Sequence, residues 1–103
     1  MERRGGEWRE PVVTLCSWEL AIPGARSLKE KRSVLRSLRD RLARMNVSFA
    51  ESGLQELRDR ALISVAFLAA HAAHSDSVRE AVDRVVAGAR DAYVVSDSTR
   101  RLG

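Results

Sequence analysis

The stretch RSLKEKRSVLRSLRDRLARM, residues 26–45, decides how the first half of this chain folds. Ser27 and Glu30 have the spacing of a capping box, which predicts a helix that begins at Leu28. Apolar side chains then recur at the three- and four-residue spacing of one helix face. We therefore predict an amphipathic helix over residues 28–45, with an apolar stripe made of Val34, Leu35, Leu38, Leu42 and Met45.

The segments on either side alternate apolar and polar residues, which is typical of strands. Before the helix, residues 12–22 form one such segment, and Pro23-Gly24 ends it as a turn. After the helix, strands are predicted over residues 46–52 and 60–70, joined by a connection over 53–59. A second helix is predicted to begin near Ser77, which forms a capping box with Glu80, and a last strand over residues 92–96.

This order, βαββαβ, predicts an α+β fold of the ferredoxin-like type, with a four-stranded antiparallel sheet and two helices on one face. Residues 11–97 form the predicted domain, between a flexible N-terminal leader (1–10) and a flexible C-terminal tail (98–103). The uncovered sheet face is apolar, and monomers rarely expose an apolar patch of that kind. We therefore predict a homodimer or partner face made of Val13, Leu15, Leu62, Ala66 and Leu68.

Length and composition narrow the class of protein. A chain of 103 residues, 45 % apolar and 31 % charged, is typical of one globular domain. No apolar run approaches the roughly 18 residues that cross a membrane, and residues 1–10 lack the apolar segment of a secretory signal. A single Cys cannot form an intramolecular disulfide. We expect a cytoplasmic protein without membrane association.

The positive charge is concentrated in the predicted first helix. Residues 26–44 contain eight cations and two acids, a net charge of +6, whereas the rest of the chain has a net charge of −2. Arg32, Arg36 and Arg39 follow one another at spacings of four and three residues, along one flank of the apolar stripe. Guanidinium groups in such a column suit phosphate groups. The helix is therefore either an ordinary solvated basic face or, as we predict, a contact surface for RNA or a ribosomal particle.

The start of this helix is also unusual. Lys29, Lys31 and Arg32 lie in or near the first turn, where cations oppose the helix dipole at a cost of about 0.3–1 kcal/mol each. Lys31 projects from the middle of the apolar stripe. Either its stem is buried and its ammonium reaches solvent, or it closes an anion site with Arg32 at the helix N-terminus. The predicted RNA- or phosphate-binding set is Lys29, Lys31, Arg32, Arg36 and Arg39.

Catalytic and metal-binding arrangements are not evident. Trp18 and Phe67 occupy the strands that carry base-stacking aromatics in RNA-recognition domains, but each shares the more apolar face of its strand, which predicts core packing. His71 and His74, with Asp76 nearby, could form part of a metal site, but no fourth ligand is apparent. Cys16 is predicted to be a buried, unreactive thiol. We expect a non-enzymatic protein with no metal and no cofactor.

Four segments of the chain resemble the bacterial YlxP-like proteins, a family of unknown function: ELAIPGARSLKEKRSVLRSL, NVSFAES, RALISVAFLA and HSDSV. The similarity spans about Val12 to Asp97, and SLKEKR is its most specific part. The resemblance implies a ferredoxin-like fold and a link to ribosome biogenesis or translation, because such genes tend to neighbour translation genes. The family's segment between the middle strands is acidic and often aromatic, whereas this chain has GLQELRD, with Leu57 in place of an aromatic residue.

The sequence favours a non-enzymatic RNA- or ribosome-associated protein that contacts phosphates through the Arg-rich face of its first helix. Two alternatives remain open. One is a homodimeric protein-interaction module that acts through the open sheet face, and the other is a small-anion sensor with its site beside Lys31.

Overall fold

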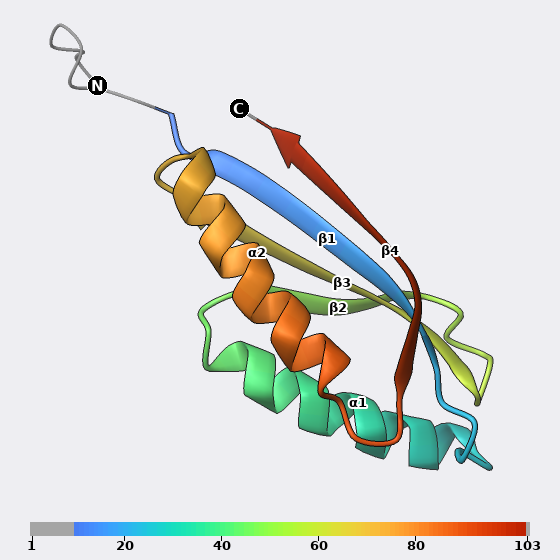
Figure 1. Cartoon of the computed structure of the whole chain (residues 1–103). Helices are drawn as coiled ribbons and strands as arrows, with labels where there is room; N and C mark the ends of the chain where they lie inside the picture. The colour runs from blue at the N-terminus through green and yellow to red at the C-terminus, as the bar shows by residue number, and fades with distance from the viewer. Residues whose placement is uncertain (1–9, 103) are drawn as a thin grey trace, which may run out of the picture.

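The computed structural model describes residues 10–102, and these residues form four strands and two helices in the predicted order (Figure 1). The strands lie in the order β2-β3-β1-β4, and each neighbouring pair is antiparallel. Both helices cover the same face of the sheet (Figure 1). The ferredoxin-like α+β fold is therefore confirmed. The elements are β1 (Val12–Ala21), α1 (Leu28–Ala43), β2 (Ser48–Gly53), β3 (Arg60–Ala69), α2 (Ala72–Ala87) and β4 (Tyr93–Leu102).

The core lies between the sheet and the helices. Burial alternates along β1 and β3, because successive side chains of a strand point to opposite faces. Trp18 and Phe67 are both buried on the helix-covered face, which confirms their core placement. The Trp18 indole Nε1 donates a hydrogen bond to Asp83 Oδ1 of α2 at 3.1 Å, so this buried aromatic also satisfies its polar atom.

The start of α1 agrees with the capping prediction. The Glu30 N–H donates to Ser27 Oγ at 3.1 Å, and Glu30 Oε1 in turn accepts from the Arg26 N–H at 3.1 Å. The helix ends at Ala43, two residues before the predicted end. Asn46 has a left-handed φ of 57° in the turn that follows, a conformation that Asn adopts more readily than most residues.

The predicted start of α2 is wrong. The helix begins at Ala72, five residues before Ser77, and its N-cap is His71, whose Nδ1 accepts a hydrogen bond from the His74 N–H at 3.2 Å. In this additional turn Ser75 points into the core, where its Oγ lies 2.7 Å from Thr14 Oγ1 of β1. The hydropathy pattern did not indicate this first turn, because its buried residue, Ser75, is polar and its N-cap is a histidine.

The buried hydroxyl pair leads to a stability prediction. We expect Ser75→Ala to lower the free energy of unfolding by about 1–3 kcal/mol, because Thr14 keeps a fully buried hydroxyl that has lost its partner. Ser77→Ala is the matched control, since it makes the same helix substitution at an exposed position and should change stability by less than about 0.5 kcal/mol. Urea unfolding of both variants measures the difference, and equal effects would contradict the prediction.

The C-terminal prediction also needs correction. The last strand does not end at residue 96, and residues 98–102 are not a tail but the second half of β4. β4 pairs with β1 over nearly its whole length, from Ala21↔Tyr93 to Val13↔Leu102. All ten β4 residues are exposed at this sheet edge, so backbone pairing rather than burial forms the strand, and hydropathy carried little signal of it. Residues 1–9 of the predicted leader and Gly103 lie outside the described residues.

Candidate nucleic-acid interface

The three predicted arginines of the α1 column lie together along a groove between α1 and β2. Arg32, Arg36 and Arg39 are all exposed, and the groove they line has a volume of about 240 Å³. Leu35 of α1 and the half-buried Phe49 of β2 contribute its apolar surface, and Ala50 and Glu51 complete the lining. The helix therefore presents its guanidinium groups beside the edge strand of the sheet.

The electrostatics of the groove favour an anion. Its only acidic lining residue is Glu51, whose Oε2 lies 2.9 Å from Lys31 Nζ, so an internal cation already neutralises that carboxylate. Within residues 10–102, none of the ion pairs that form involves Arg32, Arg36 or Arg39. The three guanidinium groups thus keep their five-donor forks available for an external partner.

Lys31 does not belong to the binding set, which corrects the prediction made for it. Its side chain is 1 % exposed, and its Nζ donates to three backbone oxygens: Leu54 O at 2.8 Å, Leu57 O at 2.6 Å and Arg60 O at 2.9 Å. These bonds use all three N–H groups of the ammonium. Neither predicted environment is present, because Nζ reaches neither solvent nor a site for an external anion.

Glu51 completes this buried arrangement. Its Oε2 is in contact with Nζ but accepts no well-directed hydrogen bond, since the ammonium N–H groups point at the three carbonyls, so the contact is an ion pair. Glu51 follows Phe49 on the helix side of β2, as the register with β3 shows. In the sequence, Glu51 shares the helix-facing side of its strand with Phe49, and Lys31 lies in the apolar stripe of α1. These two positions together are the sequence signal that predicts an ion pair between Lys31 and Glu51.

The connection between β2 and β3 is shaped by the same cation. Leu54 has a left-handed φ of 58°, and the Leu57 N–H donates to Leu54 O at 3.1 Å, which closes a turn. The turn directs two of its carbonyl oxygens at Lys31 Nζ. The segment 53–59, to which the sequence assigned no role, thus encloses the Lys31 ammonium.

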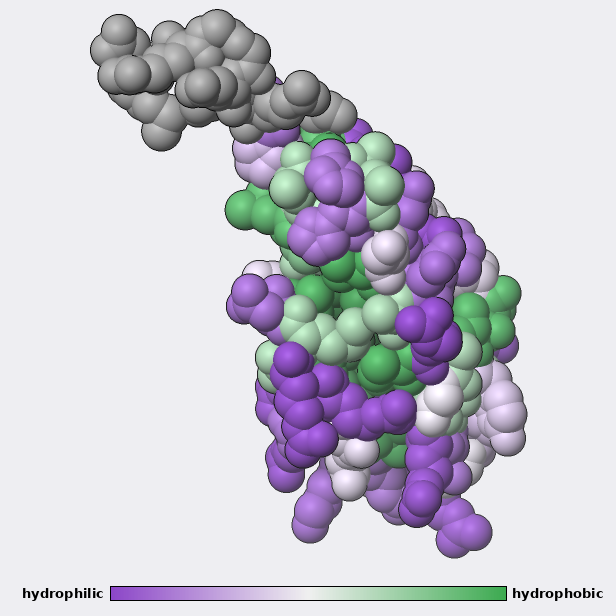
Figure 2. All heavy atoms as spheres, turned by 60° about the vertical axis from the view of Figure 1, so that its left-hand side comes forward, coloured by the Kyte–Doolittle hydropathy of each residue, from purple (hydrophilic) through white to green (hydrophobic). Residues whose placement is uncertain are grey.

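Lys29 remains exposed in the first turn of α1 but is not among the residues that line the groove. In Figure 2, hydrophilic side chains gather on the lower part of the molecule, at the height where Figure 1 draws α1. Because Lys29 is exposed about one helical turn before Arg32, it extends the basic surface toward the start of the helix without contributing to the groove. The candidate interface is the α1–β2 groove with Arg32, Arg36 and Arg39, flanked by Lys29.

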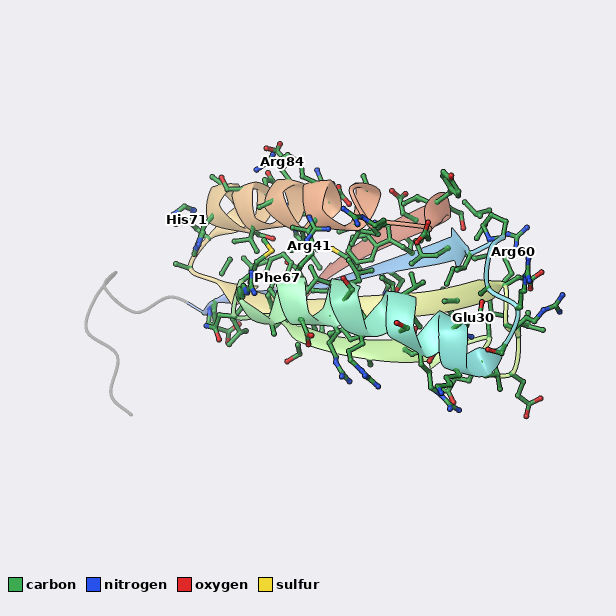
Figure 3. All side chains as sticks on the ribbon, turned by 90° about the horizontal axis from the view of Figure 1, so that it is seen from below. Glu30, Arg41, Arg60, Phe67, His71 and Arg84 are labelled. Carbon is green, nitrogen blue, oxygen red and sulfur yellow. The ribbon has the colours of Figure 1, made fainter. Side chains whose placement is uncertain are left out.

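A second cavity, of about 420 Å³, lies between α1 and the C-terminal end of α2. Arg41 of α1 reaches across it and donates to Gly88 O at 3.4 Å, and Figure 3 shows Arg41 between the two helices. Gly88 is the C-cap of α2, so carbonyl oxygens and the negative end of the helix dipole face this cavity. Arg41 compensates that dipole, which makes the cavity a weaker anion site than the α1–β2 groove.

The residues considered for metal binding or catalysis have structural roles. His71 caps α2, and His74 Nδ1 accepts from the Ala70 N–H at 3.3 Å; Figure 3 shows His71 at the end of the helix. Burial raises the pKa of the Cys16 thiol, an effect only partly opposed by the hydrogen bond from Thr99. Within the described part of the chain, no three His, Cys, Asp or Glu side chains are arranged to hold a metal ion. Neither described helix is long and apolar enough to span a membrane.

The fold and the groove define a small ferredoxin-like protein with a basic helix surface and one uncovered sheet face. The chain belongs to the family described as a protein of unknown function (DUF503), whose model matches residues 13–99. No curated protein matches the chain. The family description names no activity, so the chemistry of the groove is the basis for its proposed role.

Proposed function

We propose that this protein binds RNA without catalysing a reaction, through phosphate contacts along the α1–β2 groove. The observation that carries the proposal is the column of Arg32, Arg36 and Arg39, exposed and unpaired by any described acid, beside a carboxylate that Lys31 already neutralises. Contacts of this kind position a protein on a nucleic acid without reading its sequence. The shape of the RNA, or a protein partner bound to the same RNA, then determines where this protein binds.

The chain's resemblance to bacterial YlxP-like proteins supports a more specific setting, namely association with a ribosomal particle in the bacterial cytoplasm during ribosome biogenesis or translation. A ribosomal particle displays a dense array of phosphates, which matches three guanidinium groups spread over about 10 Å of helix. A small-anion sensor is less well supported. It required Lys31 in the site, and that ammonium is fully occupied by Leu54, Leu57 and Arg60 oxygens.

Salt dependence tests the proposed binding mode. For a single-stranded RNA probe, we expect the logarithm of the binding constant to fall by about 0.7 per phosphate contact for each tenfold rise in salt, or about 2–3 for three to four contacts. Fluorescence anisotropy with a labelled oligonucleotide measures this slope. Binding that does not change with salt, or no binding to single-stranded or duplex RNA at low salt, would exclude the proposal.

A pull-down from bacterial lysate tests the cellular partner. We expect the protein to capture ribosomal particles and to lose them after nuclease treatment, because the contact is made to RNA. Partners that persist after nuclease treatment would instead support the protein-interaction module predicted as an alternative.

A further inference from the structure

The sheet face away from the helices is apolar and uncovered. β1 and β3 place there all five residues of the predicted partner face: Val13, Leu15, Leu62, Ala66 and Leu68. Leu68 is 64 % exposed, and Leu102 of β4, which pairs with Val13, is 67 % exposed. Large apolar side chains at this exposure form a continuous row across three strands at one end of the face.

The polar side chains at the centre of this face already satisfy one another. Ser64 Oγ of β3 lies 2.8 Å from Ser17 Oγ of β1 and 2.7 Å from Ser52 Oγ of β2, so three hydroxyls form a chain across the sheet. At the other end, Arg60 and Glu19 form an ion pair at 3.0 Å. Burying hydroxyls that keep their hydrogen bonds costs far less than burying unsatisfied ones. The face is therefore suited to exclusion of water.

We propose that two copies of this chain form a dimer by packing these open faces against each other about a two-fold axis that runs parallel to the strands, between β1 and β3. Such an axis places each β1 residue of one copy over its own β3 register partner in the second copy. Val13 then lies over Leu68, Leu15 over Ala66 and Ser17 over Ser64, following the observed register. Apolar residues meet apolar residues, and hydroxyls meet hydroxyls.

Charge supports a second copy as the occupant. In the same register Glu19 lies over Leu62, one step along the face from Arg60 of the second copy, so the ion pair within each chain gains an opposite charge across the interface. β4 lies over β2, which brings Arg100 beside Ser48 at the rim, where the guanidinium reaches water. Among residues 10–102, no like charges lie directly over one another in this arrangement.

The size of the face also suits a dimer. Four strands about 4.8 Å apart and on average about 30 Å long give a flat area of about 600 Å² for this face. The accessible surface is larger, because the side chains project from the sheet. Stable interfaces bury about 800 Å² per partner. Both helices lie on the outer sides of the proposed dimer, so the two α1–β2 grooves remain accessible, and the dimer does not rest on the proposed RNA binding.

Sedimentation equilibrium of the full chain tests the dimer. We expect the protein to be dimeric at tens of micromolar, and Leu68→Arg to weaken dimerisation at least about hundredfold, because it buries a charge without a partner. Leu57→Arg makes the same change at an exposed leucine in the β2–β3 connection, outside the face, and should leave the dimer intact. A monomeric wild-type chain at 100 µM, or equal effects of the two substitutions, would overturn the proposal.

Cross-linking tests the direction of the axis. In the proposed dimer the Leu68 positions of the two copies lie at the same end, with the sheets about 10 Å apart, so Leu68→Cys should react with itself through a bis-maleimide of that span. Arg84→Cys is the control, because Figure 3 shows Arg84 on the side of α2 away from α1, on the outer surface of the dimer. If a dimer forms but Leu68→Cys fails to cross-link, either its two-fold axis does not run along the strands or the copies pair through another surface, such as the β4 edge. Either result contradicts the proposal.

Discussion

Lys31→Met is expected to lower the free energy of unfolding by about 3–5 kcal/mol, the range typical when one partner of a buried charge pair is removed. Methionine preserves most of the side-chain volume but leaves Glu51 without its cation. It also leaves the carbonyl oxygens of Leu54, Leu57 and Arg60 without their donor. Urea unfolding monitored by circular dichroism measures the change as a shift of the midpoint.

Lys29→Met is the matched control for this prediction. The two lysines are two residues apart in α1, but Lys29 is exposed, so its replacement should change stability by less than about 0.5 kcal/mol. Glu51→Gln should lower the free energy of unfolding by about 1 kcal/mol, a loss between those of the two lysine variants. Glu51 is 24 % exposed, and Lys31 keeps its three carbonyl partners in this variant. A Lys31→Met variant within 1 kcal/mol of wild type would show that the enclosed ammonium contributes little.

Reversing the charge of Arg32, Arg36 and Arg39 together to glutamate is expected to weaken RNA binding at least about hundredfold. The salt slope should fall by about 2, since three phosphate contacts are lost. Because all three side chains are exposed and none forms an ion pair in the described part of the chain, stability should change little. We expect the melting temperature to move by less than about 4 °C.

The control for net charge is the triple variant Arg58→Glu, Arg84→Glu and Arg90→Glu. It makes the same change in net charge at exposed arginines outside the α1–β2 groove. If RNA binding depended only on the overall charge of the protein, both triple variants would lose affinity equally, which is the outcome that contradicts the groove as the contact surface.

The fold was largely predictable because local patterns of apolar and polar residues specify most of its helices and strands. Alternation in residues 12–22 and 60–70 and the apolar stripe of α1 specify which faces must be buried, and the Ser27 cap marks the start of the helix. The errors occurred where polar groups form the structure. The first turn of α2 depends on a His71 cap and a buried Ser75, and the second half of β4 depends on backbone pairing at an exposed edge.

The candidate site was predictable only in part. The spacing of Arg32, Arg36 and Arg39 placed them on one helix flank, but the sequence could not show that β2 lies beside that flank and forms a groove with it. Neither could it distinguish Lys31 from its neighbours by charge alone, because all the basic residues of the helix carry the same formal charge.

By itself, the sequence determined the order of the elements, the buried face of each, and the concentration of positive charge in RSLKEKRSVLRSLRDRLARM. Only the tertiary structure decided which of those charges can meet a partner. It brought the oxygens of Leu54, Leu57, Arg60 and Glu51 around one ammonium of this helix and left three guanidinium groups at the surface. The physical reason is that a buried cation requires oxygen atoms from all around it, and residues distant in the chain supply them only once the sheet has formed.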